Sequence, residues 1–378
     1  MVDEEKTTRG PILVTKSSMP PLDEYVSEIA PLWETHWLTN AGPIHQLLSN
    51  KLERYLSVEK YRAFCQWTFC TGSGHRSVWS ERGGYYNSLH LCTSTTHALV
   101  RRGITPVFCD VKQDDFTIDP NKIEALITPR TTAIVPVHVY GHACDVEAIE
   151  AIAKKHGLIV IYDAAHAFGE RYKDRSLLSY GDISMLSFHA TKVFNTIEGG
   201  ALCFKNAALH PVFKKIRDFG ITGPETVESI DGNFKMNEFC AAMGVCNLRH
   251  VDDEISKRKR VFDRYYEKLQ GIPGVGLMVP QQDVTPNYAY MPVTFDEQKC
   301  GSSRDDICFM LAQHGIFARK YFYPLTSDFV CYAGRFDSSQ TPIAQWAAKH
   351  VLCLPMFADL PLENVDEICS IIYRGCNL

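Results

Sequence analysis

An acidic residue and a lysine follow two apolar runs of this 378-residue chain, at positions where chemistry could take place. Asp163 ends the run 158–162, and Lys192 follows the run 182–188. In open α/β sheets, ligands gather at the carboxyl ends of strands, so a carboxylate and an amine there are placed to bind a small molecule. An amine beside apolar residues can also lose its charge and act as a nucleophile towards an aldehyde.

Each of these residues also has an ordinary structural interpretation. Position alone fits Asp163 equally well as the N-cap of a helix. Most lysines lie on the surface, and the only local support for Lys192 is the pair Gly199 and Gly200, which permits close approach of the backbone to a neighbour or ligand. Spacing alone therefore predicts a small-molecule site without identifying its reaction.

The elements that would position these residues alternate between strand and helix from about residue 104. Pro120 opens one predicted helix that runs to Ile127, and Asp145 and Gly157 bracket another. Apolar and β-branched runs predict buried strands at 105–110, 132–139, 158–162, 182–188 and 200–204. This alternation predicts an α/β fold with a mostly parallel central sheet.

Chain length and a change of texture after residue 235 predict two domains. A long, increasingly charged helix is expected at 236–269, and short strands and helices alternate after it. We therefore expect a large α/β domain over 1–245 and a smaller C-terminal α/β domain over 246–378.

Composition excludes several classes of protein. The net charge of −5 favours neither nucleic acid nor an anionic membrane surface. No apolar run has the length of a membrane span and the first ten residues lack a signal-peptide layout, so a cytoplasmic location is expected. None of the 14 cysteines shows Cys-x-x-Cys spacing, so we expect buried reduced thiols and no metal site.

Two motifs taken together resemble the DegT/DnrJ/StrS sugar aminotransferases. These are fold-type I enzymes that depend on pyridoxal 5'-phosphate (PLP), with the broad fold of aspartate aminotransferase. The motifs are YDAAH at 162–166, and SFHATK at 187–192 followed by EGG at 198–200. Further matches cover nearly the whole chain, at 37–43, 137–141, 232–238, 321–325 and 352–355.

The resemblance implies a role for each matching residue of the cofactor site. Lys192 would hold PLP and, once displaced by the substrate amine, move a proton between cofactor and substrate carbon. Asp163 would pair with the N–H of the pyridine ring. His166 would lie beside the ring, near its phenolic oxygen, and Ser187 would contact the phosphate.

Other matches imply partners. Asn233 and Lys235 lie on a loop that, in the family, reaches the phosphate of the neighbouring subunit, which implies a homodimer with shared active sites. Arg319 and Tyr321 are candidates for contacting a nucleotide-sugar substrate.

The resemblance implies transfer of an amino group from an amino acid, usually L-glutamate, to a nucleoside-diphosphate keto-deoxysugar. The motifs are most similar to those of the dTDP-4-amino-4,6-dideoxy-sugar transaminases, or of their 3-amino relatives, which serve amino-sugar and surface polysaccharide (O-antigen) biosynthesis. A dehydratase relative has histidine in place of the lysine, and Lys192 argues against that activity.

Residues 66–92 depart from the family pattern. The family has there a phosphate-binding turn at a helix start and an aromatic ring that stacks on the cofactor. This chain has a stretch rich in Gly, Ser, Arg and Tyr without a helical or strand period. Helix N-termini bind phosphate through free N–H groups, so the loss of one would matter.

A pair of compensating frameshifts would explain this segment. Read from the second base of each codon, 81–91 can give KGEVITTPFTF, which resembles the family's next strand and stacking aromatic, and 66–67 can give Asn-Gly. The stretch 94–97 then resumes the family pattern. The alternative is a divergent insertion. Codons incompatible with the shifted frame would exclude the frameshift. The damaged segment also leaves open a second function, that of a catalytically impaired or purely binding homologue.

Overall fold

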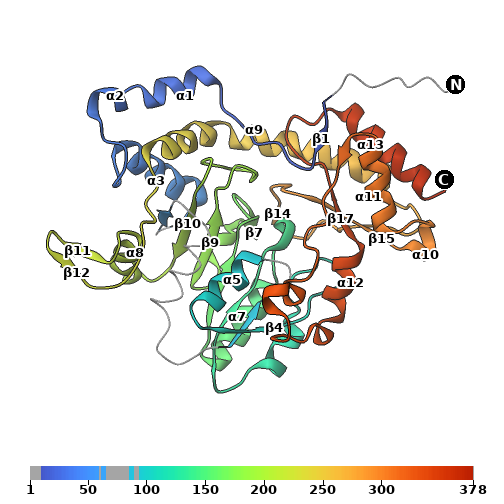
Figure 1. Ribbon diagram of the computed structural model, residues 1–378, viewed down its shortest axis with the longest axis horizontal. Helices are drawn as coiled ribbons and strands as arrows, with labels where there is room; N and C mark the ends of the chain where they lie inside the picture. The colour runs from blue at the N-terminus through green and yellow to red at the C-terminus, as the bar shows by residue number, and fades with distance from the viewer. Residues whose placement is uncertain (1–9, 59–60, 65–84, 89–92, 378) are drawn as a thin grey trace.

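The computed structural model describes residues 10–58, 61–64, 85–88 and 93–377 (Figure 1). Its centre is a seven-stranded sheet in the order β2-β10-β9-β6-β5-β3-β4. Strand β10 is antiparallel to both neighbours, and the other pairs are parallel, which confirms the predicted sheet. The strands are β2 (Tyr61–Phe64), β3 (Tyr85–Ser88), β4 (Thr105–Phe108), β5 (Thr131–Val135), β6 (Ile159–Asp163), β9 (Ile183–Ser187) and β10 (Gly200–Phe204).

The predicted strands are found, with three of them shorter at the carboxyl end, of which β9 ends one residue early, at Ser187. β5 ends at Val135 because Pro136 has no N–H to donate to a neighbouring strand. β4 ends at Phe108. Every residue of β9 and β10 is buried, as expected for strands covered on both faces.

Local sequence signals explain the helices around the sheet. The carboxylate of Asp145 accepts from the backbone N–H of Ala148 at 3.0 Å, and Gly157 ends the helix with φ of 65°. The helix predicted from Pro120 to Ile127 is shorter, because its last turn tightens into a 3-10 turn at Glu124–Leu126. These helices are α3 (Pro43–Leu56), α5 (Thr93–Arg101), α6 (Pro120–Ile123), α7 (Val146–His156) and α8 (Leu209–Arg217).

One long helix, α9 (Glu238–Leu269), joins the sheet to the C-terminal elements (Figure 1). Helices α1 (Leu22–Ile29) and α3 contact it, and so does α13 (Leu362–Gly375). It spans residue 245, so the expected division of the chain there stays a prediction.

The C-terminal elements form a smaller α/β unit around a three-stranded sheet, β13-β15-β17. The parallel pair β1 (Ile12–Leu13) and β16 (Ile316–Phe317) brings the start of the described chain onto it. The unit contains β13 (Val275–Leu277), β15 (Met291–Phe295), β17 (Val351–Leu354), α10 (Glu297–Cys300), α11 (Arg304–Gln313) and α12 (Pro342–His350). Minor elements elsewhere are α2 (Leu32–Thr35), β7 (Arg171–Tyr172), β8 (Arg175–Ser176), β11 (Ile221–Gly223), β12 (Thr226–Val227) and β14 (Val284–Thr285).

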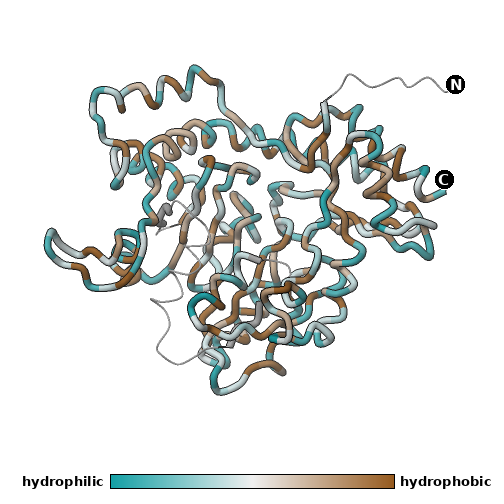
Figure 2. The backbone as a smooth tube through the Cα atoms, viewed as in Figure 1, coloured by the Kyte–Doolittle hydropathy of each residue, from teal (hydrophilic) through white to brown (hydrophobic). Residues whose placement is uncertain are grey.

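The apolar core is divided between the two parts. Two clusters pack against the central sheet, and the larger of them extends to Ala344 and Cys353 of the C-terminal elements. A third gathers Val261, Phe295 and Ile12 around the small sheet. Figure 2 shows hydrophobic segments along the central strands and hydrophilic turns at the periphery. Full burial of one such side chain stabilises the fold by about 1.5–3 kcal/mol, so the sheet that positions the strand ends is a stable frame.

Eleven cysteines lie among the described residues, all as free thiols, and eight of them are buried. Burial raises the pKa of the Cys203 thiol to about 12, so it stays protonated. Within the same described part of the chain, no three His, Cys, Asp or Glu side chains form a metal-binding group. None of the helices described there is long and apolar enough to cross a bilayer.

Candidate active site

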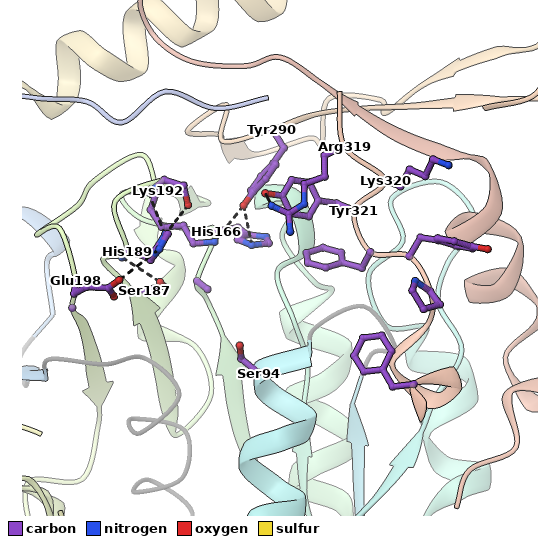
Figure 3. A pocket seen from close by; sticks show the side chains of 17 residues that line it. Ser94, His166, Ser187, His189, Lys192, Glu198, Tyr290, Arg319, Lys320 and Tyr321 are labelled. Atoms are coloured by element: carbon purple, nitrogen blue, oxygen red, sulfur yellow. Dashed lines mark hydrogen bonds and ion pairs between the residues drawn. The ribbon is translucent and has the colours of Figure 1, made fainter. Parts of the chain in front are cut away.

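The carboxyl ends of β6 and β9 bring four of the predicted residues together. Asp163 is the last residue of β6 and Ser187 the last of β9, and these strands are parallel neighbours. His166 and Lys192 lie on the loops that follow. We call Asp163, His166, Ser187 and Lys192 the strand-end wall. His166, Ser187 and Lys192 line a cavity of about 730 Å³ together with Ser94, at the start of α5 (Figure 3). Asp163 is not among the described residues that line it.

The Asp163 carboxylate is fully buried and held from two sides. The backbone N–H of Ala165 donates to its Oδ1 at 3.1 Å, and the Thr95 hydroxyl of α5 donates to its Oδ2. A buried carboxylate needs such partners, because burial without them is costly. Both donors fix the orientation of the carboxylate at the end of β6.

His166 is held in one tautomer. Its Nδ1 accepts from the backbone N–H of Tyr140 at 3.1 Å, so the ring proton lies on Nε2. Burial, and then the charge of Lys192, hold the pKa of His166 well below its ordinary value. The ring is therefore neutral near pH 7, and its Nε2–H is a hydrogen-bond donor in the cavity.

Lys192 points its amine into the same cavity. Its Nζ donates to the hydroxyl of Tyr290 at 3.2 Å (Figure 3). The turn that presents it packs tightly. A Cβ on Gly199 would lie 2.2 Å from Thr196 Oγ1 and 2.8 Å from the Met236 side chain. The predicted need for close backbone approach at this glycine is therefore confirmed, and the neighbour is protein.

A second wall of the cavity comes from the C-terminal part. Arg319 and Tyr321 line it, with Lys320, Phe322 and Tyr323 of the same loop. The Arg319 guanidinium lies 4.5 Å above the Tyr321 ring and donates to its hydroxyl at 3.2 Å. We call residues 319–323 the loop wall.

Asn233 and Lys235 do not reach this cavity. Both follow the hairpin of β11 and β12 at the left edge of Figure 1, and neither is among the residues that line the cavity. Asn233 is exposed, and the Lys235 amine lies 4.4 Å above the ring of Phe219. The fold thus separates these two residues from the cavity of their own chain.

Strand β3 lies inside the anomalous segment 66–92. It pairs in parallel with β4 and β5, so a strand occupies the place that the shifted reading of 81–91 gives to the family's next strand. The remainder of 66–92 lies outside the described residues. The frameshift and the divergent insertion both stay predictions.

The structure adds two residues that the sequence did not single out. Thr95 stands in the stretch 94–97, where the family pattern resumes, and that position was the available signal for it. Tyr290 belongs to no motif. It lies just before β15 and reaches the strand-end wall only through the fold.

Comparisons with known proteins agree with this geometry. A family profile described as the DegT/DnrJ/EryC1/StrS aminotransferase family matches residues 89–373. The chain is 38% identical over 362 residues to the dTDP-4-amino-4,6-dideoxy-D-glucose transaminase of Shigella dysenteriae, covering 96% of this chain and 98% of that protein. A transaminase of the same name from Escherichia coli is 37% identical over 364 residues, with the same coverage.

A solved structure has the same fold. DesI, determined in the presence of its TDP-sugar product, matches with a TM-score of 0.91 at 29% identity, over 98% of this chain and 95% of that one. The predicted family, fold type and cofactor are therefore confirmed. The chain belongs to the DegT/DnrJ/EryC1/StrS aminotransferase family and is a PLP-dependent nucleotide-sugar aminotransferase.

Proposed function

We propose that this chain transfers the amino group of L-glutamate to a dTDP-linked 4-keto-6-deoxy sugar. The reaction would convert the keto sugar to its 4-amino derivative and glutamate to its keto acid. Two relatives are named dTDP-4-amino-4,6-dideoxy-D-glucose transaminases, at 38% and 37% identity over nearly the full chain. The observation that carries the proposal is a cavity lined by an amine and a neutral histidine, with a buried carboxylate at the end of the neighbouring strand β6.

The residues present fit PLP. The cofactor has an aldehyde, a ring nitrogen, a phenolic oxygen and a phosphate. The Lys192 amine suits the aldehyde, the Asp163 carboxylate suits a protonated ring nitrogen, and the Nε2–H of His166 suits the phenolic oxygen. The hydroxyl of Ser187 at the end of β9 suits the phosphate. The cavity of about 730 Å³ leaves room for a substrate as well.

PLP, when bound, supplies an electron sink and carries the amino group between the two substrates. The Nζ of Lys192 would hold the cofactor and, when free, take up the proton of the reacting substrate carbon and release it again. The Asp163 carboxylate would keep the ring nitrogen protonated, with Thr95 and Ala165 holding the carboxylate in place. His166 would orient the ring by donating from Nε2.

The loop wall is proposed to bind the sugar nucleotide. Arg319 offers a planar cation suited to the diphosphate, and its stacking on Tyr321 reduces the freedom of both side chains. Exposure of Arg319 leaves this cation accessible to a ligand that enters from solvent.

We propose a homodimer in which Asn233 and Lys235 complete the phosphate site of a second copy. Support comes from exposed apolar side chains on the elements beside this loop. Ile221 and Val227 of the hairpin are 46% and 67% exposed, and Trp33 is 66% exposed. Exposed apolar side chains that gather on one face mark protein–protein contacts, whereas singly scattered ones are ordinary.

Mixing two inactive variants tests the shared site. Lys192→Ala and Lys235→Ala chains, combined so that subunits exchange, should regain activity, because one site of the mixed dimer has both lysines. Light scattering should give twice the chain mass of 42.7 kDa. A monomer, or a mixture that stays inactive, would contradict the shared site. A cytoplasmic location remains our expectation.

The main experiment measures the absorbance of the bound cofactor and the rate of turnover on the same proteins. Purified wild type should absorb in the visible range and convert a dTDP-4-keto-6-deoxy sugar with glutamate faster than UDP or GDP analogues. Lys192→Ala should lose both properties. Lys349→Ala, which removes an exposed lysine of α12, should keep both. Turnover by Lys192→Ala at the wild-type rate would refute the proposed role of Lys192.

The anomalous segment 66–92 supports a second candidate, a catalytically impaired homologue. The family profile begins to match only at residue 89, near the end of this segment. Colourless protein that takes up no added PLP would favour this candidate. Sequencing the coding DNA then shows whether its codons allow the shifted frame, and a chain expressed in that frame shows whether PLP uptake is restored.

A further inference from the structure

Tyr290 brings a phenol from the C-terminal part of the chain to two residues of the strand-end wall. Its hydroxyl lies 3.2 Å from Lys192 Nζ and 3.4 Å from His166 Nε2 (Figure 3). The side chain is largely buried, with 9% exposed. A single oxygen atom in the lining of the cavity therefore contacts both the amine and the imidazole.

The segment that carries Tyr290 is bound directly to the loop that carries His166. The side-chain amide of Asn287 donates to the backbone oxygens of His166 at 2.8 Å and Phe168 at 3.0 Å. The Oδ1 of Asn287 accepts from the backbone N–H of Ala289 at 2.9 Å. These bonds fix the position of the phenol without any contribution from Lys192.

Ring contacts hold the phenol on its other sides. The Tyr290 ring meets Tyr140 edge-on at 6.0 Å and Tyr321 edge-on at 5.5 Å. Aromatic pairs of this geometry add about 0.5–1.5 kcal/mol each to simple burial. The hydroxyl is thus a fixed point towards which the flexible lysine extends.

The hydrogen-bond directions follow from chemistry. Because His166 Nδ1 accepts from the backbone of Tyr140, Nε2–H donates to the phenolic oxygen. The Lys192 amine donates to the same oxygen, which has two lone pairs and can accept both bonds. The contact restricts a side chain with four rotatable bonds and favours its protonated form.

We propose that Tyr290 is a positioning residue for amino transfer, holding the Lys192 amine beside His166 whenever that amine is not bonded to the cofactor. The inference rests on the proposed role of Lys192. Without the phenol, the free amine samples other rotamers and is less often placed to take up the substrate proton. One lost hydrogen bond to a charged group should lower kcat by about tenfold, with little change in KM for the sugar nucleotide.

The test compares two tyrosines that each lose one oxygen atom. Tyr290→Phe keeps the ring contacts and removes the hydroxyl. Tyr265→Phe is the matched control, because this tyrosine is buried in the same part of the chain and donates only to the Pro355 backbone oxygen at 3.0 Å. Thermal unfolding and circular dichroism establish that both variants are folded.

Two quantities are measured on the full chain. The first is kcat of the PLP-loaded enzyme. The second needs no turnover: the cofactor is removed, the protein is treated with acetic anhydride over a range of pH, and acetylation of Lys192 is quantified by peptide mass spectrometry. We expect the midpoint for Lys192 to move to lower pH in Tyr290→Phe, because the ammonium form loses an acceptor, and to stay unchanged in Tyr265→Phe.

Support requires both the lower kcat and the shifted midpoint in Tyr290→Phe alone. An unchanged midpoint, an unchanged kcat, or an equal effect of Tyr265→Phe overturns the proposal. Failure of the proposed function is seen separately, as turnover by Lys192→Ala, since the acetylation midpoint does not depend on the reaction.

Discussion

The two walls of the cavity are built differently. The strand-end wall takes its residues from neighbouring parallel strands and holds them through backbone groups, as Ala165 holds Asp163 and Tyr140 holds His166. The loop wall is joined to β17 by one pair of backbone bonds, between Arg319 and Cys353 at 3.0 and 2.9 Å. Its side chains depend more on one another, as Arg319 does on Tyr321, and Tyr323 is 52% exposed. The register of the sheet thus fixes the positions of the residues in the strand-end wall. The side chains of the loop wall can change with the sequence of their loop.

This difference suggests a division of work. Groups that act on developing charge must be held rigidly and away from water, as the strand-end wall holds them. Exposed ion pairs and stacked side chains are worth less, but they can be changed without disturbing the sheet. Substitutions in the first wall should therefore lower kcat, and those in the second should raise KM.

Among substitutions other than that of Lys192, the largest effect is expected at Asp163. Asp163→Asn keeps the shape of the side chain but removes the charge that would hold a proton on the cofactor ring. We expect kcat to fall by about 10²–10³-fold with a smaller change in KM. Steady-state kinetics with saturating glutamate measure this. Asp182→Asn is the control, because Asp182 lies before the amino end of β9 and accepts from Val160 N at 2.8 Å. Similar losses in both variants would contradict the role of the wall.

A smaller effect is expected at Arg319. Arg319→Ala removes the cation of the loop wall and leaves the strand ends unchanged. KM for the nucleotide sugar should rise by about tenfold, with kcat within about twofold of wild type, since binding is lost equally in the ground and transition states. Arg374→Ala, on the exposed side of α13, should change neither. A fall in kcat without a rise in KM in Arg319→Ala would contradict the assignment of substrate binding to the loop wall and of catalysis to the strand-end wall.

Sequence predicted the strand-end wall better than the loop wall. Asp163 and Ser187 end buried strands, and Lys192 follows one, so the pattern that places the strands also places these residues. The helix capped by Asp145 and ended by Gly157 was predicted to the residue for the same reason, because local hydrogen bonds determine it. Roles such as cofactor binding came from the resemblance, not from spacing.

Contacts between distant parts of the chain were not predictable. The hydroxyl of Tyr290 meets Lys192 across 98 positions, and Thr95 meets Asp163 across 68. Neither pair has a local pattern, because it depends on how whole elements pack. The separation of Asn233 from its own cavity is likewise a property of the fold.

The two walls should also differ in their response to low pH. His138 lies behind the strand-end wall, where its backbone N–H donates to the backbone oxygen of Asp163 at 3.0 Å. Its ring is fully buried and stacks on Tyr162 at 4.6 Å, and this burial lowers the pKa of His138 to about 3. The loop wall contains no histidine.

The sign of the acid effect follows from proton binding. In the unfolded chain a histidine binds a proton below about pH 6.5, whereas the folded chain keeps His138 neutral down to about pH 3. The unfolded state therefore gains protons as the pH falls through this window, and stability is lost. At pH 5.5 the loss from this residue should be about 1 kcal/mol.

His138→Gln should remove this pH dependence. Its cost to stability at pH 7 should be limited, because the Gln side chain can still accept from the backbone N–H of Cys144. Urea unfolding at pH 7 and pH 5.5 measures the difference, and His314→Gln, at the exposed end of α11, is the control. We expect the variant to lose about 1 kcal/mol less than wild type between these two pH values. If wild type and His138→Gln lose the same free energy of unfolding between pH 7 and pH 5.5, buried His138 is not a source of acid sensitivity. The two walls would then not differ in acid because of this residue.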